Sequence, residues 1–260
     1  GKIGKKHHIP LILDNTAAPY ICKPFNHGAN IVVYSTTKYI GGHGLSIGGL
    51  LIDGGNFDWE KASDRFKMLN SPDPSYHGAV WSEAAKPLGP IAYILRARVI
   101  LLRDLGSSMS PFNAFTFIQG LETLPLRMQR HCENATEIAD YLSKHDKVDK
   151  VIYPKLMSGD HLDRANKYME KGHGALVGFE LKDGVDAGKK FIDSLKLFYH
   201  VANIGDARSL AIHPSSTTHS QLSEDEKLSA GVTPGYIRLS IGLEHIDDLL
   251  EDLEQALNNS

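Results

Sequence analysis

Ser35-Thr36-Thr37-Lys38 directly follows the apolar run Ile31-Val32-Val33-Tyr34, and this junction decides the fold. An earlier apolar run at residues 9–13 ends in a similar way, on Asp14. Short apolar runs of this kind are typical of buried parallel strands. Polar groups at the carboxyl ends of neighbouring strands lie at one edge of an open sheet, where α/β proteins bind ligands. The sequence therefore predicts an α/β fold in which Asp14 and Lys38 lie at adjacent strand ends.

These strand ends combine a carboxylate, hydroxyls and an amine. Pyridoxal phosphate needs all of these groups: an amine that bonds to its aldehyde, hydroxyls for its phosphate and an acid for its ring nitrogen. An aspartate beside that nitrogen keeps it protonated, which makes the ring an electron sink. A lysine whose pKa is lowered by its surroundings can both carry the cofactor and move protons. The residues therefore point to pyridoxal phosphate as cofactor.

Simpler interpretations exist for each residue. A lysine after a strand is usually solvated, and an aspartate there often only caps the next turn. Residues 35–38 also match the Ser-x-x-Lys pattern of penicillin-recognising enzymes, whose serine is the nucleophile. Those enzymes need a Lys-Thr-Gly strand and a Ser- or Tyr-x-Asn turn, and the chain contains neither. Their serine also opens a helix, whereas Ser35 closes a β-branched run, so the hydrolase interpretation is disfavoured.

The composition narrows the possible classes. The 260 residues can bury a sizeable core, and 42% hydrophobic with 23% charged residues is ordinary for a globular protein. A formal net charge of −3 gives no basic field, so we expect no nucleic-acid partner. No apolar run reaches the length of a membrane span, so we expect no membrane partner. Two cysteines are too few for a disulfide framework, which favours a cytoplasmic location.

Other ligand motifs do not fit. The glycines at 41–49 have the wrong spacing for a dinucleotide-binding loop, and a strand rather than a helix follows them. The 13 histidines show no zinc-like spacing, so we expect no metal and interpret His43, His213 and His219 as structural. Arg238 lies in an otherwise apolar or small strand, residues 236–241, where a planar guanidinium could bind a substrate carboxylate.

Apolar spacing gives the remaining organisation. It predicts a third strand at 48–53 and a short helix at 58–67, and a helical pattern runs from 91 to 105. Two helical segments at 112–121 and 126–142 flank Pro125, which predicts a break or kink and a domain boundary. We therefore divide the chain into domains 1–124 and 125–260. In the second domain we expect strands at 174–181, 198–202 and 236–241, with helices at 186–196 and 246–257.

These residues resemble the Cys/Met-metabolism family of pyridoxal-phosphate enzymes. The attachment signature of that family corresponds to Ser35-Thr36-Thr37-Lys38-Tyr39-Ile40-Gly41-Gly42-His43-Gly44. The resemblance continues through residues 112–115, 120–124 and 238–244, and covers essentially the whole chain; Asn30 departs from the acidic residue usual there. It implies the aspartate-aminotransferase type of fold, with the C-terminal part of a large, mainly parallel-sheet domain followed by a smaller α/β domain.

The resemblance implies roles for seven residues. Lys38 would carry the cofactor and act as the catalytic base. The other cofactor contacts would be Asp14 at the pyridine nitrogen, with Ser35 and Thr37 at the phosphate. The substrate carboxylate would be bound by Arg238 and Asn203, with support from Thr218.

Within the family, the chain most resembles the O-acetylhomoserine sulfhydrylase branch. The features are Asn203, the run at 213–222 and the long segment at 56–111. Ala202 stands where cystathionine-handling relatives place a glutamate, which favours sulfide over cysteine as the nucleophile. The resemblance thus implies γ-replacement, which converts O-acetylhomoserine and sulfide to homocysteine and acetate. Cystathionine γ-synthase or methionine γ-lyase activity, or a non-catalytic fragment, remains an alternative.

The same resemblance bears on assembly. It implies an amino-acid substrate, a sulfide or small-thiol partner and a homo-oligomer built as a dimer of dimers. Residues 1–8 lack an initiator Met and read like the last turns of a helix that enters a strand. Family members have an N-terminal segment there that stacks on the cofactor and reaches a neighbouring site. We therefore expect a fragment that alone binds the cofactor weakly.

Overall fold

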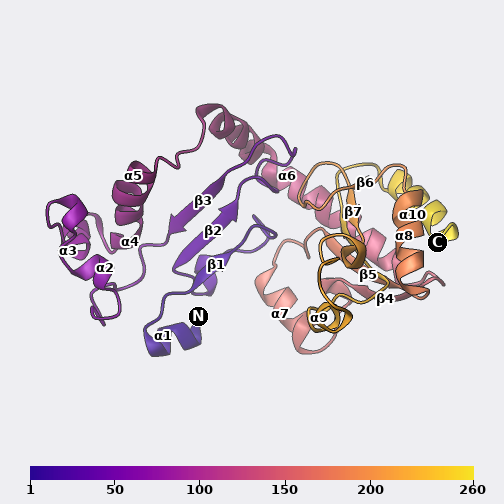
Figure 1. The fold of residues 1–260 in the computed structure, drawn as a ribbon, viewed down its shortest axis with the longest axis horizontal. Helices are drawn as coiled ribbons and strands as arrows, with labels where there is room; N and C mark the ends of the chain where they lie inside the picture. The colour runs from indigo at the N-terminus through magenta and orange to yellow at the C-terminus, as the bar shows by residue number, and fades with distance from the viewer. The chain divides into compact units, whose positions relative to one another are not determined.

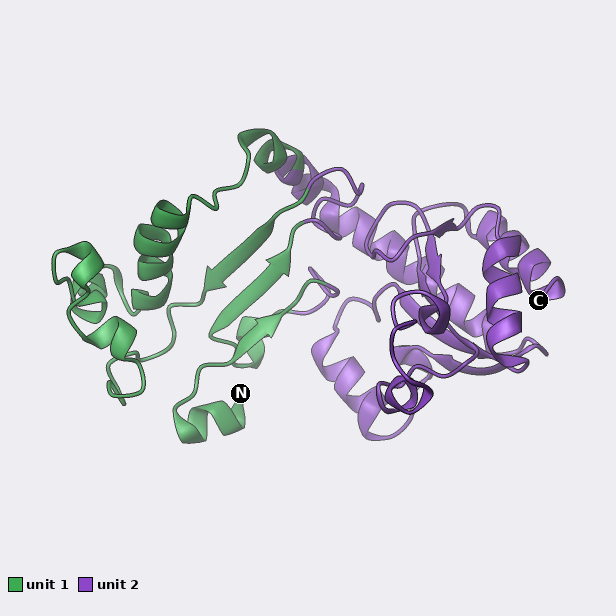
Figure 2. Cartoon of the chain, viewed as in Figure 1, with its two compact units in different colours: residues 1–16, 23–36, 47–116 green, residues 17–22, 37–46, 117–260 purple.

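The computed structural model describes all 260 residues, and the chain folds as two compact units (Figures 1 and 2). Unit 1 comprises residues 1–16, 23–36 and 47–116, and unit 2 comprises residues 17–22, 37–46 and 117–260. The chain passes from unit 1 to unit 2 between Thr36 and Thr37, so Lys38 belongs to unit 2 although the strand before it belongs to unit 1. The division into domains at 124/125 stays a prediction.

Unit 1 is built on a three-stranded sheet of order β1-β2-β3. β1 (Ile12–Asp14) is parallel to β2 (Ile31–Ser35), and β3 (Gly49–Asp53) is antiparallel to β2. The predicted parallel pair is therefore confirmed. The predicted burial of the first strand is wrong, because β1 pairs only with β2 and its Ile12 is 52% exposed.

Unit 1 also contains five short helices. They are α1 (Lys2–His7), α2 (Lys67–Asn70), α3 (Trp81–Ala85), α4 (Ala92–Arg96) and α5 (Arg103–Leu105), with a π-helical turn at 97–102 between the last two. The helical pattern predicted for 91–105 is thus confirmed. Phe57, Trp59, Leu69 and Trp81 pack with Ile31 of β2 in one buried cluster.

The helix predicted at 58–67 is wrong: the chain there forms turns, and α2 begins only at Lys67. Asp58 is the reason for the turn at its start, because its Oδ1 accepts the backbone N–H groups of Glu60 (3.1 Å) and Lys61 (3.2 Å). Such side-chain bonds compete with helical ones. Ala62 then adopts a positive φ of 61°, which a helix cannot contain.

Unit 2 contains a five-stranded sheet of order β4-β5-β8-β7-β6. Its strands are β4 (Val148–Ile152), β5 (Leu176–Leu181), β6 (Tyr199–His200), β7 (Leu210–Ile212) and β8 (Tyr236–Ser240). Only β6 and β7 pair in parallel. The predicted strands at 174–181, 198–202 and 236–241 correspond to β5, β6 and β8. The central strand, β8, carries Arg238 between Gly178 of β5 and Ile212 of β7.

The helices of unit 2 include α7 (Asp160–Tyr168), α8 (Gly184–Ser194), α9 (Glu224–Ser229) and α10 (Ile246–Asn258). The predicted helices at 186–196 and 246–257 correspond to α8 and α10. α10 buries Leu249, Leu253, Ala256 and Leu257, one face of a 3.6-residue period. α8 and α10 lie side by side in Figure 1.

The longest helix, α6 (Pro111–Leu142), passes from unit 1 to unit 2 without a break. Pro111 is its first residue, and of the break or kink predicted at Pro125 the break is wrong. A proline inside a helix removes one hydrogen bond, here to the carbonyl of Leu121. Leu121 and Pro125 both lie on the exposed face, so water can solvate the freed carbonyl. None of the helices, α6 included, is long and apolar enough to span a membrane.

Candidate active site

Lys38 lies in a tight turn directly after β2. The turn is closed by a hydrogen bond of 2.7 Å from the N–H of Gly42 to the carbonyl of Lys38. The lysine side chain is half-buried, and its Nζ donates a hydrogen bond to Oδ1 of Asn203. Two residues 165 positions apart in the sequence are thus in direct contact within unit 2.

Asn203 connects the lysine to Arg238. Nη2 of Arg238 donates to the backbone carbonyl of Asn203 at 3.1 Å. The side chain of Asn203 therefore contacts an amine while its backbone contacts a guanidinium. The structure brings Lys38, Asn203 and Arg238 together, three of the residues predicted to form the site.

Arg238 has unused hydrogen-bonding capacity. Burial lowers the pKa of its guanidinium, and its Nε is buried without a hydrogen-bond partner. An unsatisfied buried donor is costly, and guanidinium groups pair well with carboxylates. The arginine beside a lysine amine therefore fits an amino-acid carboxylate near the residue that would carry pyridoxal phosphate.

In unit 1, Asp14 and Ser35 lie at the same edge of the sheet. Asp14 is opposite Val33 in the parallel register, and Ser35 is two residues further along β2. Oγ1 of Thr16 accepts the backbone N–H of Ser35 at 2.8 Å, which ties the segment after β1 to the end of β2. Oδ1 of Asp14 accepts the N–H of Thr16 at 2.9 Å, so one carboxylate oxygen does cap the next turn. The exposed carboxylate and the Ser35 hydroxyl suit the two ends of the cofactor.

Other residues of the signature differ in their surroundings. Thr37 is half-buried in the lysine turn of unit 2, whereas Thr36 of unit 1 is buried and its Oγ1 has no hydrogen-bond partner. Thr218 lies on an exposed turn, where its hydroxyl bonds Nδ1 of His219. No hydrogen bond joins Thr218 to Asn203 or Arg238.

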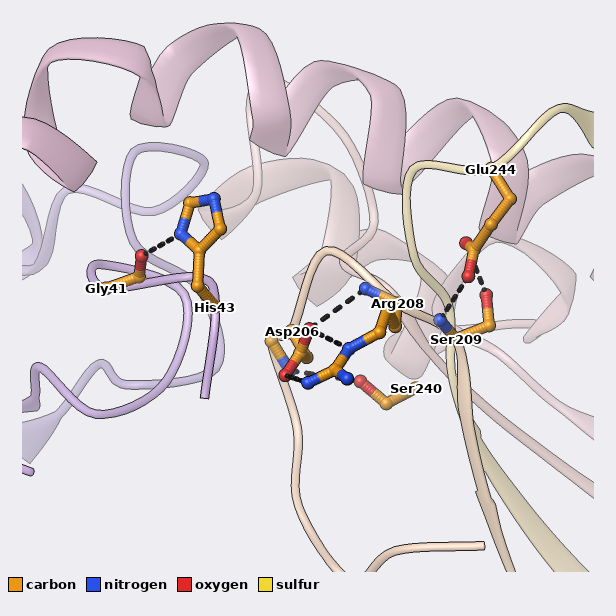
Figure 3. Close-up of polar contacts among 8 residues, drawn as sticks. Gly41, His43, Asp206, Arg208, Ser209, Ser240 and Glu244 are labelled. Carbon is orange, nitrogen blue, oxygen red and sulfur yellow. Dashed lines mark hydrogen bonds and ion pairs between the residues drawn. The ribbon is translucent and has the colours of Figure 1, made fainter. Parts of the chain in front are cut away.

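The histidines interpreted as structural have local partners. Both ring nitrogens of buried His213 are engaged, with Oγ of Ser216 at 2.8 Å and the carbonyl of Pro234 at 2.7 Å. Nδ1 of His43 bonds the carbonyl of Gly41 at 2.7 Å, so this ring folds back on its own turn (Figure 3).

A second segment, residues 203–209, supports the lysine turn from the side of the sheet. The N–H of Ala207 donates to the carbonyl of Gly42 at 2.8 Å, and the N–H of Gly205 donates to Oγ of Ser240 at 3.0 Å. Buried Asp206 pairs with Arg208 at 3.3 Å, which stiffens this segment (Figure 3). These contacts position Asn203, which begins the segment.

Glu244 holds the other end of that segment. Its two carboxylate oxygens accept the backbone N–H (2.6 Å) and the hydroxyl (2.9 Å) of Ser209, as Figure 3 shows. The same hydroxyl accepts the N–H of Gly242 at 2.8 Å. The turn after β8 is thereby fixed to Ser209, the residue directly before β7.

Sequence reasoning missed three supporting residues: Asp206, Glu244 and Arg127. Arg127 donates from α6 to the backbone of the lysine turn. A signal for it was present, because Arg127 and Ile138 share one face of the helix predicted at 126–142, and a cation is out of place on an apolar face. Asp206 and Glu244 lie in loops and carry no comparable signal.

Comparisons with known proteins show the fold and the family of the chain. A solved structure from Campylobacter jejuni subsp. jejuni, described as an O-acetylhomoserine (thiol)-lyase with N'-pyridoxyl-lysine-5'-monophosphate, matches with a TM-score of 0.91 and 44% identity. The match covers 99% of this chain and 61% of that one. The chain therefore has the fold of a pyridoxal-phosphate-dependent enzyme of the aspartate-aminotransferase type. It belongs to the Cys/Met metabolism PLP-dependent enzyme family, whose model matches residues 1–258.

Curated relatives carry related names. O-acetyl-L-homoserine sulfhydrylase of Leptospira meyeri is 56% identical over 265 residues, which cover 99% of this chain and 60% of the relative. Homocysteine/cysteine synthase of Saccharomyces cerevisiae is 44% identical, over 98% of this chain and 59% of the relative. The chain thus spans about 60% of the length of the curated relatives it matches. Pyridoxal phosphate is the cofactor of the family, as the sequence predicted.

Proposed function

We propose that this chain provides the lysine-bearing part of an O-acetylhomoserine sulfhydrylase, which forms homocysteine and acetate from O-acetylhomoserine and sulfide. The observation that carries the proposal is the contact of Lys38 with Asn203, whose carbonyl in turn accepts a hydrogen bond from Arg238. This arrangement joins an amine to a carboxylate-binding cation through one residue. The names of the relatives from Leptospira meyeri and Campylobacter jejuni support the choice of substrate.

Each residue has a distinct proposed role at the cofactor. Lys38 Nζ is the attachment point, Asp14 interacts with the pyridine nitrogen, and the hydroxyls of Ser35 and Thr37 bind the phosphate. Ser35 lies only three residues before Lys38, so the backbone keeps their Cα atoms within roughly 11 Å of each other. When bound, pyridoxal phosphate supplies an electron sink for negative charge on the substrate's α-carbon.

The reaction requires proton movements that Lys38 can perform. With the substrate bound, Nζ of Lys38 would remove the proton from the substrate's Cα and later one from Cβ. Expulsion of acetate from Cγ, addition of sulfide at the same carbon and return of the two protons to Cβ and Cα would complete the replacement. The carbonyl oxygen of the Asn203 side chain, which accepts a hydrogen bond from Nζ, orients the amine between these transfers.

Arg238 and Asn203 bind and orient the substrate. The free Nε of Arg238 offers a charged donor for the α-carboxylate, and its Nη2 keeps the Asn203 loop in place. Thr218 remains a proposed supporting residue, drawn from the resemblance alone.

The surroundings of Asn203 favour a small acceptor. Ala202 offers no carboxylate for the ammonium group of cysteine, and the nearby acid Asp206 is already paired with Arg208. Sulfide needs no such partner. The alternatives, cystathionine γ-synthase and methionine γ-lyase, would use cysteine as acceptor or release methanethiol.

We also propose a cytoplasmic homo-oligomer, a dimer of dimers, with domains at 1–124 and 125–260. Large apolar side chains at Leu45, Ile47, Phe112 and Phe115 are exposed, which supports contacts with further protein surface.

The experiment compares acceptors. The protein, supplied with pyridoxal phosphate and O-acetylhomoserine, is assayed for homocysteine with sulfide and for cystathionine with cysteine. The proposal predicts sulfide-dependent homocysteine that is lost in Lys38→Ala. Cystathionine as the main product would replace the sulfhydrylase with a cystathionine γ-synthase, and turnover that persists in Lys38→Ala would contradict the role of the lysine.

A further inference from the structure

Arg127 is a buried cation without an acidic partner. It lies on α6 within unit 2, is 7% exposed, and burial lowers the pKa of its guanidinium. A buried charge needs a full set of hydrogen bonds. Here every acceptor is a neutral oxygen, so the arginine is not held by an ion pair.

The acceptors of Arg127 include the two residues that follow Lys38. Nη1 donates to the carbonyl of Tyr39 at 2.7 Å, and Nη2 donates to the carbonyl of Ile40 at 3.1 Å. Nη2 also donates to the carbonyl of Gly120 at 2.7 Å, and Nε donates to Oγ1 of Thr123 at 3.2 Å. One planar group therefore links α6 to the backbone of the lysine turn.

The turn is shaped to fit the guanidinium. Gly42, which closes the turn on the carbonyl of Lys38, has a φ of 72°, a value that favours glycine. A Cβ at this position would overlap Nη1 of Arg127. On its other side, the carbonyl of Gly42 accepts the N–H of Ala207, from the segment that begins at Asn203.

We propose that Arg127 is a positioning residue that fixes the turn at 38–42 and thereby holds the Lys38 amine against Asn203. This inference rests on the proposed function of Lys38 as the attachment point. The planar fork of arginine reaches three carbonyls from two separate nitrogens, whereas a lysine carries all its donors on one nitrogen. Arg127 touches no reacting atom and acts only through the turn.

Arg130 provides a matched control on the same helix. Its side chain is 52% exposed and pairs with Glu133 at 3.7 Å, and it makes no hydrogen bond to the lysine turn. Three variants therefore separate the effect of losing the buried hydrogen bonds from the effect of losing one positive charge on α6. They are Arg127→Met, Arg127→Lys and Arg130→Met.

The first measurement is hydrogen exchange without cofactor, followed by mass spectrometry. We expect Arg127→Met to speed exchange of the Gly42 amide roughly tenfold, while peptides from β5 and β8 and the Arg130→Met protein exchange as in the parent. Unchanged exchange at 38–44, or an equal increase throughout unit 2, would overturn the inference. If Arg127→Met does not fold, Arg127→Lys decides by the same criterion.

The second measurement adds pyridoxal phosphate and records the circular dichroism of the bound cofactor, divided by the amount bound to Lys38. We expect this ratio to fall in Arg127→Lys and to stay unchanged in Arg130→Met, because it reports the orientation of the attached group. An unchanged ratio in Arg127→Lys would contradict a positioning role. A parent protein that attaches no cofactor at Lys38 would refute the proposed function instead, and hydrogen exchange would still decide the role of Arg127.

Discussion

Replacing Asp252 by alanine should destabilise unit 2 by about 3–5 kcal/mol. This buried carboxylate of α10 accepts the backbone N–H groups of Lys196 (2.9 Å), Leu197 (2.8 Å) and Phe198 (3.1 Å), and Nε2 of Gln255 at 3.0 Å. A hydrogen bond to a charged acceptor contributes about 1.5–3 kcal/mol. After the substitution, the N–H of exposed Lys196 can bond to water instead, but the N–H of buried Phe198 cannot. Water therefore restores only part of the lost hydrogen-bond free energy.

The assay is denaturant unfolding followed by far-ultraviolet circular dichroism, since Trp59 and Trp81 both lie in unit 1 and do not report on unit 2. Glu251→Ala, at an exposed position of the same helix, is the control and should change the free energy of unfolding by less than about 0.5 kcal/mol. A loss below about 1 kcal/mol for Asp252→Ala would refute the reasoning that this carboxylate anchors the segment leading to β6 and Asn203.

Three further predictions concern charged groups. Arg238→Lys should raise the KM for O-acetylhomoserine by about 10- to 100-fold, because a lysine cannot reproduce the planar fork; an unchanged KM in steady-state kinetics would contradict carboxylate binding. Hydrogen bonds from Ser75 and Trp81, with Arg96 nearby, lower the pKa of Asp73 from 3.8 to about 2. Unit 1 should therefore lose stability as the pH falls from about 4 to about 2. In Asp73→Asn, its stability, measured by unfolding followed by tryptophan fluorescence, should depend less on pH. Burial lowers the pKa of His131 from 6.5 to about 4, so the neutral ring is favoured in the folded state. Unit 2 should lose stability as the pH falls from about 6.5 to about 4. A His131→Gln protein whose thermal melts keep this pH dependence would contradict the claim that protonation of His131 causes the loss.

Strong local patterns predicted most of the elements. The β-branched run at 31–35 matches β2 residue for residue, and the apolar face from Leu249 to Leu257 defines α10. Local competition explains the main failures. The Asp58 side chain diverts its backbone into a turn, and Pro125 interrupts no packing because it faces solvent. β7 was missed because it has only three residues, and β4 because alternation at Val148 to Ile152 is weak.

The residue types of the site could be predicted from the sequence, but the contacts between those residues could not. Lys38 and Arg238 stood out because a charged group at the end of, or inside, an apolar strand is costly without a purpose. Asn203 entered only through the family resemblance, yet it is the residue that links the other two. The role of Arg127 depends on which carbonyls the folded turn presents to α6, and no local pattern in the sequence predicts those contacts.

Reduction with borohydride in the presence of pyridoxal phosphate, followed by peptide mass mapping, tests the central claim most directly. The parent protein and Lys38→Ala are treated alike, and the phosphopyridoxyl group is located on each peptide. We predict an adduct confined to Lys38, which disappears in Lys38→Ala without appearing elsewhere. Label spread over exposed lysines, or equal labelling of the two proteins, would contradict the claim that this turn holds the cofactor.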